Sequence, residues 1–173
     1  MVSTPTIITF TRILIILPFI LVAPDNPLLG AGLFAVASLT DFLDGYIARK
    51  TRQITRLGIL LDPIADKLLV ISALVLLVDM AMIPAWIAIV IIVREFVVTG
   101  LRIAALSKDI VIPAETGGKV KTASQIASIL ILFMDRTIIS VDFYAAGIAL
   151  LWISMIIGVI SGVQYFILFW KRI

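Results

Sequence analysis

Six long apolar stretches divide this chain of 173 residues and limit its fold more than any other feature. They cover residues 7–22, 30–49, 59–78, 84–106, 120–134 and 143–170. A helix needs roughly 20 apolar residues to cross a bilayer core that is about 30 Å thick. Hydrophobic residues make up 62% of the chain and charged residues only 14%, which excludes an ordinary soluble domain. We therefore predict an all-α integral membrane protein with six transmembrane helices in one domain, residues 1–173.

The basic residues predict how these helices are oriented. Of the 14 Lys and Arg residues, only Arg136 falls on the side that carries Asp25, Asp79, Asp135 and Asp142. Because basic residues collect on the cytoplasmic side, both termini and the connection between the second and third helices are expected to face the cytoplasm. The first stretch lacks a signal-peptide pattern and is expected to remain as an anchor. The expected location is the cell (inner, cytoplasmic) membrane.

Two residue types are absent, and their absence narrows the chemistry. The chain has no cysteine and no histidine, which excludes disulfides, thiolate or imidazole catalysis, and sulfur or imidazole metal ligands. Carboxylate oxygens remain, and these suit hard cations such as Mg²⁺ or Mn²⁺. The net charge of +3 is explained by membrane topology and anionic headgroups, so no nucleic-acid partner is expected.

Four aspartates flank the connection between the second and third apolar stretches. Asp41 and Asp44 are three residues apart, and Asp62 and Asp66 are four apart, so each pair occupies one face of a helix. A short connection makes the two helices antiparallel neighbours, which brings both pairs to the same level. We predict that the four carboxylates share two divalent cations, an arrangement that suits displacement at phosphorus. The alternative is that they only cap helix ends or face solvent.

Small and basic residues lie beside these aspartates. Gly45 and Ala48 continue the helix face of Asp41, and glycine inside a helix costs about 1 kcal/mol relative to alanine. Close approach of a ligand explains this face, although small residues also let membrane helices pack closely. Arg49 adjoins the face and is a candidate phosphate ligand, because the guanidinium pairs with phosphate oxygens in a bidentate way.

A second group of charges interrupts the fourth and fifth stretches. Arg94 and Glu95 lie inside an apolar run, where they form either a structural ion pair with a partner elsewhere or part of a polar cavity. Charges within the membrane favour the polar cavity. Lys119 and Lys121 open the fifth stretch, where snorkelling lysines are common. Together with Arg102 and Arg94 they are candidates to bind the phosphate of a small anionic acceptor.

At the aspartates the chain resembles the CDP-alcohol phosphotransferase family. The family signature is Asp, two residues, Asp-Gly, two residues, Ala-Arg, about eight residues, Gly, three residues, Asp, three residues, Asp. The chain supplies every element, at Asp41, Asp44, Gly45, Ala48, Arg49, Gly58, Asp62 and Asp66. The resemblance covers essentially the whole chain. The stretches TPTIITFTRI, REFVVTGLR and GKVKTASQ are similar to those of members that use glycerol 3-phosphate as acceptor.

The resemblance implies an enzyme of phospholipid biosynthesis that transfers a phosphatidyl group from CDP-diacylglycerol to glycerol 3-phosphate. By resemblance, Asp41, Asp44 and Asp62 bind one metal ion, and Asp41, Asp62 and Asp66 bind the second. Asp66 is also the expected general base. A homodimer is expected. The residues expected to bind CDP-diacylglycerol are Thr6, Ile7, Ile8, Thr9, Gly45, Ala48, Arg49, Thr55 and Gly58.

Three rival functions follow from the same residues. A member of the same family could use serine, inositol phosphate or phosphatidylglycerol as acceptor. A small cation or proton-coupled transporter could use the aspartates as an ion site, but such sites lie near the membrane midplane, whereas these carboxylates gather at one face. A lipid synthase with a phosphohistidine intermediate is excluded, because the chain has no histidine.

Overall fold

The computed structural model describes residues 14–51, 56–106, 116–134 and 143–172, without the side chains of residues 41–51, 56–66, 106, 116, 117, 119 and 172. Every regular element in these ranges is an α-helix, which confirms the all-α prediction. Residues 14–22 are helical. The helices that follow are α2 (Pro27–Thr51), α3 (Arg56–Asp79), α4 (Ala85–Leu106), α5 (Thr116–Met134) and α6 (Phe143–Arg172).

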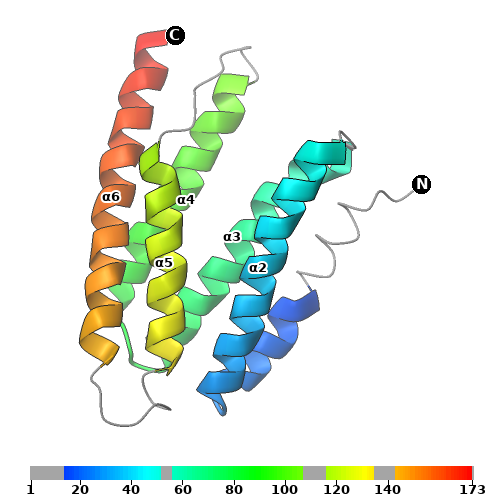
Figure 1. Ribbon diagram of the computed structural model, residues 1–173. Helices are drawn as coiled ribbons and strands as arrows, with labels where there is room; N and C mark the ends of the chain where they lie inside the picture. The colour runs from blue at the N-terminus through cyan, green and yellow to red at the C-terminus, as the bar shows by residue number, and fades with distance from the viewer. Residues whose placement is uncertain (1–13, 52–55, 107–115, 135–142, 173) are drawn as a thin grey trace.

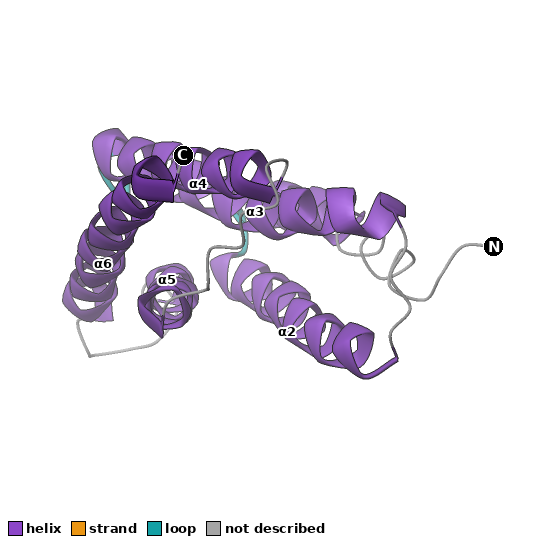
Figure 2. Ribbon diagram, turned by 90° about the horizontal axis from the view of Figure 1, so that it is seen from above, coloured by secondary structure: helices purple, strands orange, loops and turns teal. Residues whose placement is uncertain are grey.

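Consecutive helices from α2 to α6 run in opposite directions (Figure 1). The C-terminal ends of α2, α4 and α6 therefore lie at the same end of the molecule as the N-terminal ends of α3 and α5. Viewed from above, α5 lies between α6 and α2, with α3 and α4 along the other side (Figure 2). Helix α5 contacts α2, α3 and α6, and its contact with α6 is the most extensive between any two of these helices.

The start of α2 follows from a local cap. Pro27 occupies the first helical position, and the side chain of Asn26 accepts a hydrogen bond from the backbone N–H of Leu29 at 3.1 Å. Gly30 then passes close to the preceding turn: a Cβ atom at this position would lie 2.6 Å from Cβ of Ala23. The absence of a side chain at Gly30 lets residues 14–22 pack back on α2.

The end of α3 is a Schellman turn without glycine. The N–H of Met82 donates to the carbonyl of Leu77 at 2.8 Å, and the N–H of Ala81 donates to that of Val78 at 2.9 Å. Ala81 takes the left-handed conformation that this turn requires, with φ of 56°. The turn sends the chain directly into α4, which makes α3 and α4 antiparallel neighbours.

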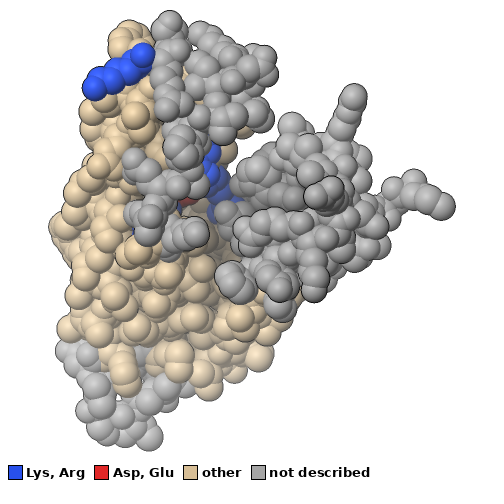
Figure 3. Space-filling view, turned by 45° about the horizontal axis from the view of Figure 1, so that its top comes forward, with Lys and Arg blue, Asp and Glu red and all other residues tan. Residues whose placement is uncertain are grey.

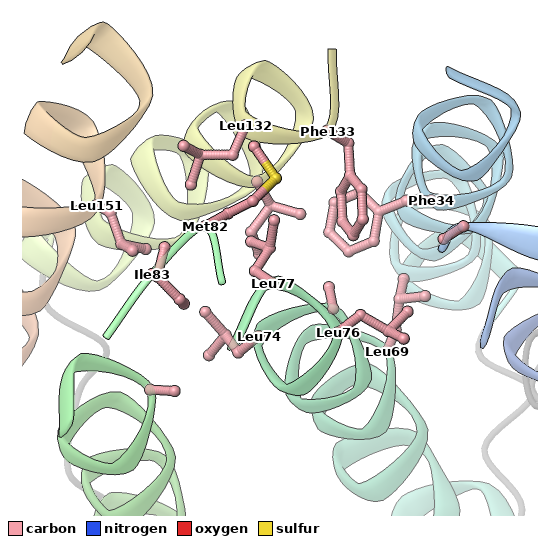
Figure 4. Packing of buried hydrophobic residues seen from close by; sticks show 14 of the residues in the cluster. Phe34, Leu69, Leu74, Leu76, Leu77, Met82, Ile83, Leu132, Phe133 and Leu151 are labelled. Atoms are coloured by element: carbon pink, nitrogen blue, oxygen red, sulfur yellow. The ribbon is translucent and has the colours of Figure 1, made fainter. Parts of the chain in front are cut away.

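The apolar core joins residues 14–22 to α2 and α5. The rings of Phe19 and Phe34 lie 5.9 Å apart, and those of Phe19 and Phe133 lie 5.6 Å apart. Figure 4 shows the same cluster continuing to Leu77 and Leu151 from α3 and α6. This core lies near the turn between α3 and α4, and so away from the end of the molecule where α2 and α3 are connected.

Large apolar side chains also cover the outer surface. Leu14, Val36, Ile89 and Ile103 are among those more than half exposed, and Trp170 is 72% exposed. Within the described residues, one helical stretch is long and apolar enough to cross a membrane, Phe143–Lys171 in α6. Two shorter apolar helical stretches are Pro27–Thr40 and Val120–Met134.

Helix α5 begins earlier than its apolar stretch. The stretch predicts a start at residue 120, but the helix starts at Thr116 and includes Gly118 and Lys121 in its first turns. Thr122 donates a hydrogen bond to the carbonyl of Gly118 at 3.0 Å, so this polar turn is held within the helix. A search for apolar residues misses such a turn, because its side chains are polar.

Candidate functional site

The four aspartates of the signature lie on the two helix segments that meet at one end of the molecule. Asp41 and Asp44 belong to the last turns of α2, and Asp62 and Asp66 belong to the first turns of α3. The side chains of all four lie outside the described residues. Among the side chains that are described, no three potential metal ligands gather in one place. The shared metal site therefore stays a prediction, which the carboxylate donors fit by their chemistry.

For some residues expected to bind CDP-diacylglycerol the structure describes the backbone alone, and the others lie outside the described residues. Gly45, Ala48 and Arg49 lie in α2, and Gly58 lies in α3, all without described side chains. The positions outside the described residues are Thr6, Ile7, Ile8, Thr9 and Thr55. Helical periodicity places position 45 one turn after position 41, so the predicted small-residue face is compatible with the helix that forms.

A carboxylate in the middle of α4 collects three cationic side chains. Glu95 is only 12% exposed and accepts hydrogen bonds at both oxygens. Oε2 accepts from Nζ of Lys67 at 2.6 Å, and Oε1 accepts from Nη1 of Arg94 at 2.8 Å and from Nζ of Lys121. These ion pairs connect α3, α4 and α5. Since a buried charge is costly without partners, this cluster is stable only as a unit.

Arg94 connects α4 to α6 through hydrogen bonds. Its Nε donates to the carbonyl of Gly158 at 2.7 Å, and its Nη2 donates to the hydroxyl of Ser161 at 2.5 Å. With Nη1 bound to Glu95, each of the three guanidinium nitrogens has a partner inside the protein. Arg94 therefore pairs with Glu95, whereas the sequence favoured a place in a polar cavity, and its first role in this structure is to hold two helices together.

Arg102 lies two helical turns further along α4, away from the Glu95 cluster. Its Nη2 donates to the hydroxyl of Tyr165 at 3.2 Å, and its guanidinium carbon lies 5.0 Å from the centre of that ring. Tyr165 is 3% exposed, whereas Arg102 is exposed. The tyrosine thus fixes Arg102 at the surface between α4 and α6.

A small cavity of about 30 Å³ adjoins the Glu95 cluster. Aliphatic side chains of α3 and α4 form part of its wall, and its polar lining consists of Lys67, Glu95, Lys121, Thr122 and Gln125. Figure 3 shows basic and acidic atoms recessed between the tan surface and the grey part, and a separate group of basic atoms at one end of the molecule. Three cations and one carboxylate leave the cluster with a net charge of +2. Such a site can bind a small anion.

The structure brings together some of the predicted acceptor residues and not others. Arg94 and Lys121 share Glu95, whereas Arg102 has a separate partner. The side chain of Lys119 lies outside the described residues. Sequence reasoning missed two cavity residues, Lys67 and Gln125. A signal existed for each: Lys67 directly follows Asp66, and Gln125 is four residues after Lys121 and thus on the same helix face.

Comparison with known proteins gives one consistent result. A family model described as CDP-alcohol phosphatidyltransferase matches residues 2–161, a range that includes all four aspartates, the Glu95 cluster and Gln125.

Curated relatives are similar over nearly the whole chain. A protein of Bacillus subtilis (strain 168) is 44% identical over 151 residues, which cover 87% of this chain and 78% of the relative. A protein of Rickettsia bellii (strain RML369-C) is 39% identical over 171 residues, covering 95% and 93%. A protein of Escherichia coli (strain K12) is 36% identical over 172 residues, covering 94% and 92%. All three are named CDP-diacylglycerol–glycerol-3-phosphate 3-phosphatidyltransferase.

Proposed function

Because this chain belongs to the CDP-alcohol phosphatidyltransferase family, we propose that it transfers the phosphatidyl group of CDP-diacylglycerol to glycerol 3-phosphate. The products are phosphatidylglycerophosphate and CMP, so the protein is a phosphatidylglycerophosphate synthase of phospholipid biosynthesis. The observation that carries this proposal is similarity along almost the full length to relatives that bear this name, 44% in one case. The complete aspartate signature, from Asp41 to Asp66, lies within the matched residues.

The enzyme is expected to act from within the cell membrane with its site facing the cytoplasm. The exposed apolar side chains on all the described helices support a lipid-facing surface, as does the length of α6. Six transmembrane helices with both termini in the cytoplasm agree with the distribution of basic residues. The alternating direction of α2 to α6 is compatible with this topology. We expect the protein to function as a homodimer.

The four aspartates are proposed to hold two divalent cations, Mg²⁺ or Mn²⁺. Asp41, Asp44 and Asp62 are assigned to one ion, and Asp41, Asp62 and Asp66 to the other. Their positions on α2 and α3 support this assignment, because α2 ends and α3 begins at the connection between the two helices. When bound, such ions offset the charge of the pyrophosphate and of the leaving phosphate.

The chemical step requires one base and one leaving group. Asp66 accepts the proton of the 1-hydroxyl of glycerol 3-phosphate, and the hydroxyl oxygen forms a bond to the phosphatidyl phosphorus. The bond from that phosphorus to the bridging oxygen breaks, and CMP leaves with the electron pair. A carboxylate suits this role, since the chain has neither histidine nor cysteine.

The substrates are assigned to two groups of residues. CDP-diacylglycerol is expected along Thr6–Thr9, Thr55, Gly58 and the face of Gly45, Ala48 and Arg49. The acceptor phosphate is expected among the basic residues Arg94, Arg102, Lys119 and Lys121. Of these, Lys121 has the strongest structural support, because its side chain lines the charged cavity. Arg94 supports the site indirectly, through its bonds to Gly158 and Ser161.

The test is a transfer assay with the full-length protein purified in detergent. With Mg²⁺ present, label should pass from CDP-diacylglycerol to glycerol 3-phosphate, and no transfer would reject the proposed function. Asp66→Asn removes the base and should lower the rate by roughly 10²-fold or more while the protein still elutes as a folded species. Full activity of this variant would remove Asp66 as the base.

A further inference from the structure

Gln125 carries a buried amide that lacks a partner. The residue is 2% exposed, and its Nε2 has no hydrogen-bond partner among the described residues. Buried polar groups are nearly always paired, and an unpaired one weakens folding. A methionine of the same length would fill this place without that penalty. Packing of the helix alone therefore does not account for a glutamine at this position.

The position of Gln125 places its side chain in the charged cavity. It lines the cavity together with Lys67, Glu95 and Lys121. Gln125 follows Lys121 by four residues in α5, which corresponds to one turn or about 6 Å along the helix. Helix α5 begins at the end of the molecule where α2 and α3 connect, so Gln125 lies one turn further from that end than Lys121. The amide thus adds an uncharged polar contact to a cavity whose other polar contacts include two ammonium groups.

We propose that Gln125 binds the acceptor, by donating a hydrogen bond from Nε2 to an oxygen of the acceptor's phosphate group between Lys67 and Lys121. This inference rests on the proposed function. A phosphate monoester carries about −1.5 to −2 charges at neutral pH, which matches the net charge of +2 of the cluster. The cavity has room for an oxygen atom or two, so it receives one end of the phosphate group.

The alternative occupant of this cavity is a single ordered water molecule. Water would also satisfy the amide and would fit the volume of about 30 Å³. The two occupants differ in their effect on affinity. If the acceptor occupies the cavity, the affinity for glycerol 3-phosphate depends on Gln125; if water occupies it, that affinity does not. A kinetic and binding comparison therefore separates them.

The experiment measures kcat and KM of the full-length enzyme and of Gln125→Met, a substitution that keeps the shape and removes the donor. We expect KM for glycerol 3-phosphate to rise by about tenfold or more, because a hydrogen bond to a charged group is lost. The values of kcat and of KM for CDP-diacylglycerol should stay close to wild type, since the contact does not involve the reacting atoms. Gln125→Glu, which replaces the donor by a negative charge of similar size, should raise this KM further.

Ser128→Ala is the matched control on the same helix. Ser128 is fully buried, but its hydroxyl donates to the carbonyl of Gly147 at 2.7 Å, so its partner lies within the protein. This variant should lower the thermal midpoint and leave KM for glycerol 3-phosphate unchanged. Gln125→Met should do the opposite, with an unchanged or higher midpoint and a raised KM.

A binding measurement that needs no turnover completes the test. Glycerol 3-phosphate should raise the thermal midpoint of the wild-type protein, and Gln125→Met should largely abolish that shift. Wild-type KM and a wild-type thermal shift in both Gln125 variants would overturn the inference and leave the proposed function standing. A wild-type protein that transfers no label to glycerol 3-phosphate would overturn both.

Discussion

A single carboxylate organises the charged residues between three helices. Glu95 is bound by Lys67 and Lys121, which lie 28 and 26 residues away in the chain, and by its neighbour Arg94. All four side chains are largely buried, with Lys121 only 6% exposed. In such surroundings the cations need a counter-ion, because desolvation of an unpaired charge is costly. Glu95 therefore keeps the lysines in place.

Glu95→Gln should destabilise the protein strongly. The substitution keeps the shape of the side chain but leaves three buried cations without a negative partner, which costs about 3–5 kcal/mol when a buried pair is broken. The thermal midpoint of the full-length protein in detergent should fall accordingly. Asp25→Asn, which changes an exposed carboxylate, is the control and should leave the midpoint unchanged. Equal midpoints for Glu95→Gln and wild type would show that the cluster does not stabilise the fold.

At the scale of the helix, two glycines of α2 differ in how much space surrounds them. A Cβ atom at Gly30 would lie 2.6 Å from Cβ and 2.8 Å from Cα of Ala23. At Gly32 a Cβ atom would meet nothing within 4 Å. Gly30 is therefore required for the close contact between the preceding turn and α2. Gly32 serves no such contact in the described part of the chain.

Alanine substitutions at these two glycines should have opposite effects. Gly30→Ala forces the turn at Ala23 away from α2 and should cost about 1–3 kcal/mol, as overpacking does. Gly32→Ala adds a methyl group in open space and should stabilise the helix by up to about 1 kcal/mol. Thermal unfolding of the two variants side by side measures the difference. A midpoint for Gly30→Ala at or above that of Gly32→Ala would contradict the close approach.

Helix positions follow from the sequence more readily than helix ends. The apolar stretches 30–49, 59–78, 84–106 and 143–170 all lie within or nearly within α2, α3, α4 and α6. A long run of apolar residues is enough to predict that a helix is present. The N-terminal turn of α5 is polar, so hydropathy places its start at residue 120 instead of Thr116. Ser154 of α6 donates a hydrogen bond to the carbonyl of Lys121 at 3.2 Å, a contact between helices that no local pattern records.

For the molecule as a whole, the sequence predicts which residues are close along one helix better than it predicts which side chains pair between helices. Helical spacing suffices to group Asp41 with Asp44 and Asp62 with Asp66, because these residues are local. The pairing of Lys67 and Lys121 with Glu95 depends on how α3, α4 and α5 pack, so sequence alone leaves Glu95 without its partners. The sequence does not single out Gln125, because an amide among apolar residues is ordinary. Only the structure shows that its Nε2 has no hydrogen-bond partner in the part of the chain that is described.

The alternating helices bring two charged regions close to each other. The aspartate segments lie at the connection of α2 and α3, and the Glu95 cluster lies beneath them, beginning with Lys67, the residue after Asp66. An acceptor held by the cluster is thereby kept near the proposed base. This arrangement favours a small acceptor that carries its own phosphate, since the net charge of +2 would serve no purpose for an uncharged alcohol.

An acceptor panel tests the central claim most directly. The purified full-length protein is given labelled CDP-diacylglycerol and Mg²⁺, with glycerol 3-phosphate, serine, inositol phosphate or phosphatidylglycerol in separate reactions. We predict label in a new lipid only with glycerol 3-phosphate, with one CMP released for each lipid formed. Efficient transfer to another acceptor, with none to glycerol 3-phosphate, would contradict the proposed function.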